Sequence, residues 1–145
     1  MSMRVERTLI SDTCVIYYSA KGNTKAIVNL FDDNKFDVYK VTEINNVDFS
    51  YYKNIVFATS TWGRGVPPKQ FFNVRDVLLS ISNKNIGLFG SGQSHYEYFC
   101  GALDLLEEML TLKNNIIFKY KYEGYPKEID FENMKIHMEE LKCLK

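Results

Sequence analysis

The sequence has few of the residues that build metal and disulfide sites. Its 145 residues include three cysteines, Cys14, Cys100 and Cys143, and two histidines, His95 and His137. The cysteines are odd in number and widely spaced, without a Cys-x-x-Cys pair, and neither histidine lies near another ligand at zinc-site spacing. We therefore expect neither a disulfide framework nor a bound metal ion.

Long apolar runs are also missing. The longest stretches, such as Cys14 to Tyr18 and Ile55 to Ala58, are far shorter than the roughly 20 residues that a membrane helix needs. Residues 1–11 are polar and charged, and they lack the apolar centre of a secretory signal peptide. We expect a cytoplasmic protein that does not engage a membrane.

The chain has no excess of charge of either sign. Eighteen basic residues balance eighteen acidic ones, so the composition gives no electrostatic reason to expect a nucleic-acid partner. The hydrophobic fraction is 46%, which suits a globular core. The length suits one domain, and we expect residues 1–145 to form it.

Short apolar segments rich in β-branched and aromatic residues alternate with amphipathic stretches. The period of two, or a short buried run, predicts strands at Cys14–Tyr18, Phe36–Val41, Asn54–Thr59, Ile86–Gly90 and Ile116–Tyr122. Apolar residues three and four apart predict helices from Asn23 to about Phe31 and at Gln70–Ile81, Phe99–Leu112 and Phe131–Leu144.

This alternation predicts an α/β fold, a doubly wound parallel sheet covered by helices on both faces. Such sheets bind ligands at the carboxyl ends of their strands, beside the switch point. The loops that follow the first, third and fourth predicted strands are therefore the candidate site.

The first of these loops runs from Ser19 to Thr24 and contains Gly22 and Asn23. Small, hydroxyl and glycine residues that open a helix leave backbone N–H groups for an anion such as a phosphate. An ordinary helix start, with Asn23 or Thr24 as its cap, explains this loop alone equally well. The Gly-Lys-Ser/Thr ending of a nucleotide P-loop is absent.

Aromatic residues stand in the other two loops. The sequence's single tryptophan, Trp62, lies among glycines and hydroxyl residues after the third strand, and Tyr96 and Tyr98 follow the fourth. Rings at a sheet edge suit stacking against a flat aromatic ligand. Each ring, taken alone, is explained equally well by packing into the core.

The three loops together resemble those of the flavodoxin family, and the resemblance runs from about Cys14 to the C-terminus. The first loop matches the family's phosphate loop at Ser19 and at Gly22-Asn23-Thr24. The second matches the family's Thr-x-Thr-Trp-Gly pattern from Thr59 to Gly63. The stretch Phe89-Gly90-Ser91-Gly92, followed by Ser94 and Tyr96 to Ala102, is the most specific match.

The resemblance implies a three-layer α/β/α flavodoxin-like fold with five parallel strands in the order 2-1-3-4-5. It also implies non-covalently bound FMN, with no catalytic residue and no metal. The implied FMN-binding residues are Ser19, Ala20, Lys21, Gly22, Asn23, Thr24, Ser60, Thr61, Trp62, Gly63, Arg64, Ser91, Gly92, Gln93, Tyr96, Tyr98, Phe99 and Cys100.

The implied roles divide by loop. Residues 19–24, with Ser60 and Thr61, hold the phosphate. Trp62 covers the inner face of the flavin ring and Tyr96 the outer face. Backbone groups near Gln93 and Cys100 hold the pyrimidine oxygens. A flip of the Gly63 peptide offers a carbonyl to N5–H of the neutral semiquinone, and glycine suits this because it lacks a Cβ.

The resemblance further implies a monomeric, low-potential one-electron carrier rather than an enzyme. Its redox partners would be a flavodoxin reductase-type donor and an acceptor enzyme. Two related functions stay open, an activator of a dimanganese ribonucleotide reductase and a small FMN-dependent reductase. A non-redox receiver-type module needs acidic metal ligands after the first strand, and Ser19 to Thr24 has none.

The sequence departs from the family at several positions. Lys21 replaces the usual Thr of the phosphate loop, which places a cation beside a dianion, so we expect FMN binding to depend more on salt. Glu97, Asp104, Glu107 and Glu108 form either an acidic face near the flavin or an ordinary solvated helix face. Residues 1–12 have no counterpart in the resemblance. Three interpretations of this N-terminal extension stay open, namely an extra edge strand, a disordered arm and a partner contact.

Arg64 and Gln93 stand where the family often has acidic residues. One charge at about 8 Å, with an effective dielectric near 40, is worth roughly 1 kcal/mol, or about 40 mV for one electron. Less negative charge around the flavin stabilises its fully reduced anion. We therefore predict that Arg64→Asp with Gln93→Asp makes the second reduction potential more negative by roughly 120 mV, since three charge units change. Redox titration of the double variant and wild type measures this difference. Equal second reduction potentials would contradict the hypothesis that residues 64 and 93 set the potential.

Overall fold

The structure is a computed structural model that describes residues 12–18, 22–29, 36–60, 73–92 and 101–143. Five strands form one parallel sheet in the order β2-β1-β3-β4-β5. The strands are β1 (Thr13–Tyr18), β2 (Asp37–Lys40), β3 (Asn54–Ser60), β4 (Asn85–Gly92) and β5 (Asn115–Glu123). The order reverses between β1 and β3, as predicted, and this places the switch point there.

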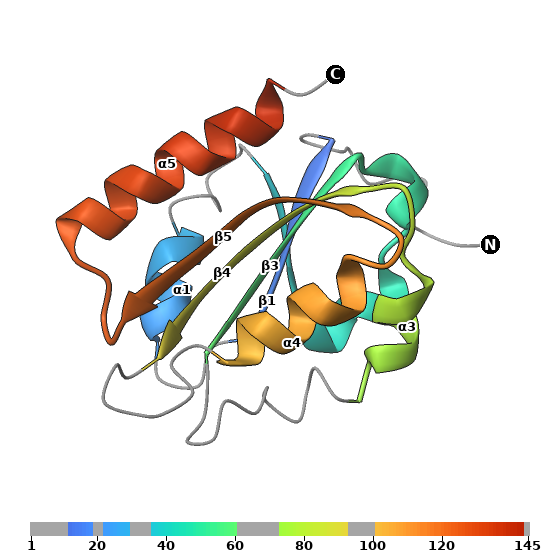
Figure 1. Ribbon diagram of the computed structural model, residues 1–145, viewed down its shortest axis with the longest axis horizontal. Coiled ribbons are helices and arrows are strands. Elements are labelled where there is room, and N and C mark those ends of the chain that lie inside the picture. The colour runs from blue at the N-terminus through green and yellow to red at the C-terminus, as the bar shows by residue number, and fades with distance from the viewer. Residues whose placement is uncertain (1–11, 19–21, 30–35, 61–72, 93–100, 144–145) are drawn as a thin grey trace.

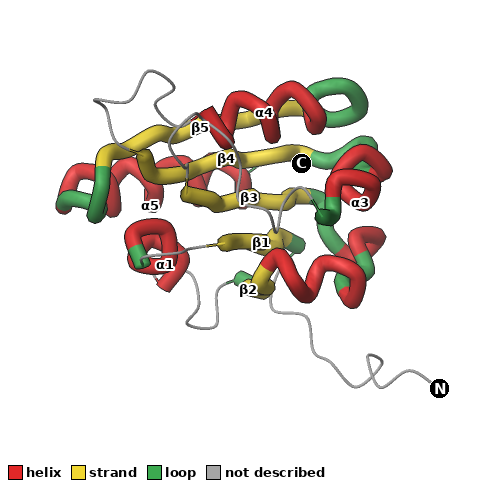
Figure 2. The backbone as a smooth tube through the Cα atoms, turned by 90° about the horizontal axis from the view of Figure 1, so that it is seen from below, coloured by secondary structure: helices red, strands yellow, loops and turns green. Residues whose placement is uncertain are grey.

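Helices cover both faces of the sheet (Figures 1 and 2). On one face, α1 (Asn23–Val28) and α5 (Glu128–Lys142) pack against a core that includes Val15, Val56 and Phe89. On the other face lie α3 (Arg75–Ser80), α4 (Gly101–Leu110) and two 3-10 helices, η3 (Val41–Asn46) and η4 (Phe49–Tyr51). The predicted three-layer α/β/α arrangement is confirmed.

The predicted helical stripes face these cores. In α4, Leu103, Leu106 and Leu110 are fully buried, and Met109 packs against the same cluster. In α5, the buried residues include Met134 and Met138. The spacing of three and four residues therefore identified the inward side of each helix correctly.

Some element bounds differ from the prediction. The second strand ends at Lys40, because η3 begins at Val41 and its first turn is closed by a hydrogen bond from Lys40 N to Glu43 Oε1 at 2.8 Å. Helix α5 begins at Glu128 rather than at residue 131, because Asp130 Oδ2 accepts from Lys127 N at 2.7 Å. Residues 30–31, 70–72, 99–100 and 144, which the predictions included in helices, lie outside the described part.

Strand β2 also carries a buried carboxylate that alternation did not predict. Asp37 is 2% exposed and accepts a hydrogen bond from Tyr52 Oη at 2.7 Å, and the hydroxyl oxygens of Tyr52 and Tyr39 are 2.8 Å apart. Burial raises the pKa of Tyr52, and so do its hydrogen bonds to Tyr39 and Asp37. This network lies at the amino ends of the strands, away from the candidate site.

A bulge in β5 brings an aromatic ring onto the backbone of β4. Ile86 is paired with Ile116, but Gly87 is paired with Phe118, so one extra residue separates the two pairs. A Cβ at Gly87 would clash with the Phe118 ring. That ring stacks on His137 of α5, with 4.7 Å between centroids, so it has little room to move.

We predict that Gly87→Ala destabilises the protein by about 1–3 kcal/mol, because the added methyl overpacks this contact. Denaturant unfolding of the apoprotein measures the loss. Phe118→Leu is the matched control, because its smaller side chain relieves the clash. The double variant should then lose less unfolding free energy than the sum of the losses in the two single variants. Strict additivity of the two losses contradicts this account.

Candidate functional site at the carboxyl edge of the sheet

The register brings the ends of β1, β3 and β4 to one edge of the sheet. Tyr18 pairs with Thr59, and Thr59 pairs with Gly90. Six of the predicted FMN-binding residues at this edge are described, namely Gly22, Asn23, Thr24, Ser60, Ser91 and Gly92. The others lie outside the described residues, namely Ser19, Ala20, Lys21, Thr61, Trp62, Gly63, Arg64, Gln93, Tyr96, Tyr98, Phe99 and Cys100.

Three hydroxyl residues form a row across this edge. Ser60 of β3 pairs with Ser91 of β4, and Ser91 pairs with Tyr122 of β5. Neighbouring residues in register point to the same face of a sheet. That face is the one covered by α1, because Tyr122 and Ala58, two residues before Ser60, both belong to the core on which α1 packs. We call Ser60, Ser91 and Tyr122 the hydroxyl row.

The first turn of α1 is attached to this row. Gly22 precedes the helix with φ +86°, a left-handed conformation that glycine adopts without a Cβ penalty, and it supplies no side-chain cap to the helix. Thr24 is fully buried, and its Oγ1 lies 3.4 Å from Ser91 Oγ. Tyr122 Oη donates to Asn23 O at 2.9 Å.

Ser60 differs from the other two members of the row. Within the described residues, its Oγ is a buried side-chain oxygen that has no hydrogen-bond partner. A buried hydroxyl without a partner costs about 1–3 kcal/mol, and such an atom in a native protein calls for an explanation, such as a ligand. The residues at this edge therefore fit a ligand that carries hydrogen-bonding oxygens, such as a phosphate.

Comparison with known proteins identifies the family. The flavodoxin family model matches residues 15–138. The chain belongs to the flavodoxin family. Its relatives include a flavodoxin of Maridesulfovibrio salexigens, 31% identical over 130 residues, with 81% of this chain and 89% of the relative covered. A probable flavodoxin 2 of Bacillus subtilis is 28% identical, and the match covers 83% of this chain and 87% of the relative.

Solved flavodoxin structures have the same fold. Oxidised flavodoxin 2 of Bacillus cereus matches 90% of this chain and 99% of its own, with a TM-score of 0.75 and 27% identity. Flavodoxins are electron-transfer proteins whose cofactor is FMN. A Fusobacterium nucleatum flavodoxin has been solved with flavin mononucleotide bound, and at 19% identity and a TM-score of 0.58 it shows the common fold.

Two features of this flavodoxin site were missed by sequence reasoning. Tyr122 was taken only as the end of a strand, and it lies opposite Ser91 because the bulge in β5 shifts the pairing by one residue. Lys119 and Lys121 were not assigned to the site, although alternation along β5 places them on the face opposite Tyr120 and Tyr122. These two lysines change the interpretation of the predicted acidic face, which includes Asp104 and Glu107.

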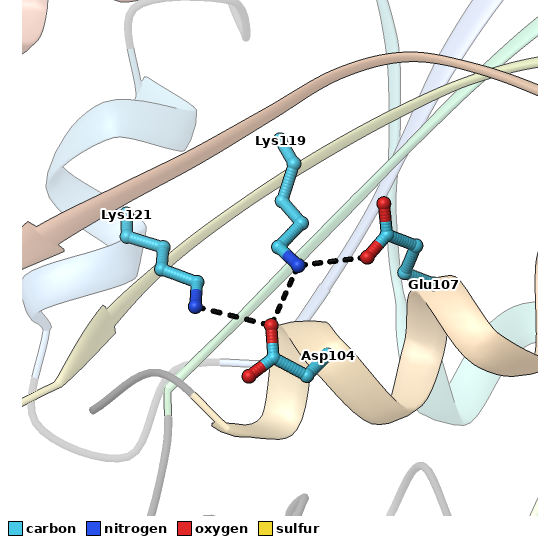
Figure 3. A network of polar contacts seen from close by, with 4 residues as sticks. All are labelled: Asp104, Glu107, Lys119 and Lys121. Carbon is cyan, nitrogen blue, oxygen red and sulfur yellow. Dashed lines mark hydrogen bonds and ion pairs between the residues drawn. The ribbon is translucent and has the colours of Figure 1, made fainter. Parts of the chain in front are cut away.

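Asp104 and Glu107 of α4 are ion-paired with β5 (Figure 3). Lys119 Nζ lies 2.6 Å from Asp104 Oδ1 and 2.7 Å from Glu107 Oε1, and Lys121 Nζ lies 3.0 Å from Asp104 Oδ1. Partial burial opposes ionisation of Asp104, but the two lysines outweigh it and hold the pKa of its carboxyl below the usual value. The two carboxylates therefore belong to a charge-balanced cluster, not to an unpaired acidic face.

In the described part of this flavodoxin, the remaining ionisable groups form no further candidate metal-binding or reactive site. No group of three or more His, Cys, Asp or Glu side chains there is arranged to hold a metal. None of the described helices combines the length and the apolar character needed to span a membrane. Burial raises the pKa of the Cys14 thiol, and the charge of Asp37 raises it further, so this cysteine is kept as an unreactive thiol.

Proposed function

We propose that this flavodoxin is a one-electron carrier that holds FMN without a covalent bond at the carboxyl edge of β1, β3 and β4. The observation that carries the proposal is the buried Ser60 Oγ, which has no hydrogen-bond partner in the described part of the chain. The FMN phosphate would accept a hydrogen bond from this hydroxyl and from backbone N–H groups of the loop that contains Gly22, Asn23 and Thr24.

The redox chemistry is supplied by FMN when it is bound, and the protein holds and orients it. The proposed stacking of Trp62 and Tyr96 on the flavin, and the contacts of the other predicted residues, complete the site. We propose that a flavodoxin reductase-type protein donates the electrons and an acceptor enzyme receives them. We also propose that the protein is a cytoplasmic, single-domain monomer.

Stepwise anaerobic reduction, followed by absorption spectroscopy, tests the proposed function. We predict a yellow protein that passes through a distinct half-reduced form with long-wavelength absorption, because a one-electron carrier must separate its two reduction steps. A protein that stays colourless after incubation with FMN contradicts the proposed site. Flavin that is bound but takes both electrons in one step contradicts the carrier and favours the oxygen-activating or reductase function.

Replacement of Ser60 separates its role in binding from its role in stability. We predict that Ser60→Ala raises the Kd for FMN about tenfold, equivalent to about 1.4 kcal/mol, because a charge-assisted hydrogen bond is lost. The same change leaves the unfolding free energy of the apoprotein equal or slightly higher, because a buried hydroxyl without a partner is removed.

Flavin fluorescence titration and denaturant unfolding measure the two quantities. Ser80→Ala is the matched control, since it removes a hydroxyl that binds Val77 O on the exposed end of α3, and we expect no change in FMN affinity. Equal FMN affinity of Ser60→Ala and wild type would exclude a phosphate contact at Ser60.

A further inference from the structure

A hydrogen bond joins the end of β5 to the start of α1, two elements that lie far apart in the sequence. Tyr122 Oη donates to Asn23 O at 2.9 Å, and the two residues are 99 positions apart. The tyrosine is 3% exposed and belongs to the core on the α1 face. Its ring is therefore fixed by packing, and its hydroxyl is held at one place relative to the helix.

A second contact lies directly beside the first. Ser91, the register partner of Tyr122, has its Oγ 3.4 Å from Oγ1 of Thr24, the residue after Asn23. Two consecutive residues of α1 are thus bound to two neighbouring strands. Among the backbone contacts of the helix start, Ala26 N donates to Gly22 O at 2.9 Å, so the turn that the strands hold includes Gly22 itself.

We propose that Tyr122 is a positioning residue for the FMN phosphate, which rests on the proposed function of this edge. The Tyr122 hydroxyl acts through the Asn23 carbonyl and fixes the first turn of α1 relative to Ser60, the third member of the hydroxyl row. Ser91 and Tyr122 use their hydroxyls to hold the helix, and Ser60 keeps its hydroxyl for the ligand.

The first turn of α1 must also be held in place precisely. Groups that bind a ligand must be held to within about 0.5 Å of the productive geometry by neighbours that are themselves locked. Without the Tyr122 hydroxyl, the Asn23 carbonyl loses this partner, while the neighbouring contact between Thr24 and Ser91 remains. The oxygens of that contact are 3.4 Å apart, which is long for a bond between hydroxyls, so Tyr122 provides the shorter of these two neighbouring contacts.

The test compares FMN with riboflavin, which has the same ring system but no phosphate. Apoproteins of wild type and Tyr122→Phe are titrated with each ligand by flavin fluorescence. We predict that Tyr122→Phe raises the Kd for FMN about threefold to tenfold, the range expected for one hydrogen bond. The Kd for riboflavin stays within about twofold, because the ring packing of residue 122 is kept.

Tyr120→Phe is the matched control. It removes the neighbouring hydroxyl of β5, which donates to Asp130 Oδ1 at 2.6 Å and accepts from Asn133 Nδ2 at 3.1 Å on α5, and we expect both Kd values to stay at the wild-type level. Thermal unfolding of each apoprotein follows folding. If Tyr122→Phe unfolds at a lower temperature than wild type, both titrations are repeated at a temperature at which every variant is fully folded, and the same selective loss of FMN affinity is expected.

The outcomes separate this proposal from the one on which it rests. If wild type prefers FMN but Tyr122→Phe keeps the same ratio of the two Kd values, the positioning role is wrong and the phosphate site stands. If Tyr122→Phe weakens FMN and riboflavin equally, the hydroxyl has only a structural role. If wild type binds riboflavin as tightly as FMN, the phosphate site is itself wrong, and the role of Tyr122 with it.

Discussion

The parallel pairing of β3, β4 and β5, with the one-residue bulge in β5, is the constraint on which the site depends. It aligns Ser60, Ser91 and Tyr122 across three strands and directs all three side chains to the face that α1 covers. A shift of one residue in any strand would turn its hydroxyl to the opposite face of the sheet. Because both faces are buried, such a shift would also expose the inward residues of two cores, so the register is strongly specified.

The two ends of the sheet carry different polar groups for different purposes. At the amino ends, buried polar side chains bind one another, as in the bond from Asn54 Nδ2 to Thr13 Oγ1 at 3.0 Å and the one from Asn85 Nδ2 to Asn54 Oδ1 at 3.0 Å. At the carboxyl edge, Ser60 Oγ is left without a partner among the described residues. The amino end is therefore satisfied within the protein, and the carboxyl edge has bonding capacity that suits a ligand.

Much of the fold could be predicted from the sequence because its signals are local. Buried runs and period-two alternation identified all five strands to within two residues at either end, and helical periodicity identified the inward faces of α4 and α5. The strand order came from the resemblance to flavodoxins. The two 3-10 helices, η3 and η4, were missed. Helix η3 forms where Glu43 closes a turn at Lys40, and the apolar pattern of Phe36 to Val41 gives no sign of this local bond.

The contacts that could not be predicted join residues far apart in the chain. The bond of Asp37 to Tyr52, that of Tyr122 to Asn23 and the ion pairs of Lys119 depend on how strands and helices meet, and no short motif encodes them. For the candidate site, motifs gave Gly22, Asn23, Thr24, Ser60 and Ser91, which the structure brings to one edge. Motifs could not show that Ser91 faces the helix whereas Ser60 has no partner among the residues that the structure describes, because that depends on the register.

A crystal structure of the protein with FMN tests the central claim most directly. We predict a phosphate oxygen within hydrogen-bond distance of Ser60 Oγ, with the bond from Tyr122 Oη to Asn23 O retained. FMN bound at another place, or at this edge with Ser60 Oγ still without a partner, would contradict it.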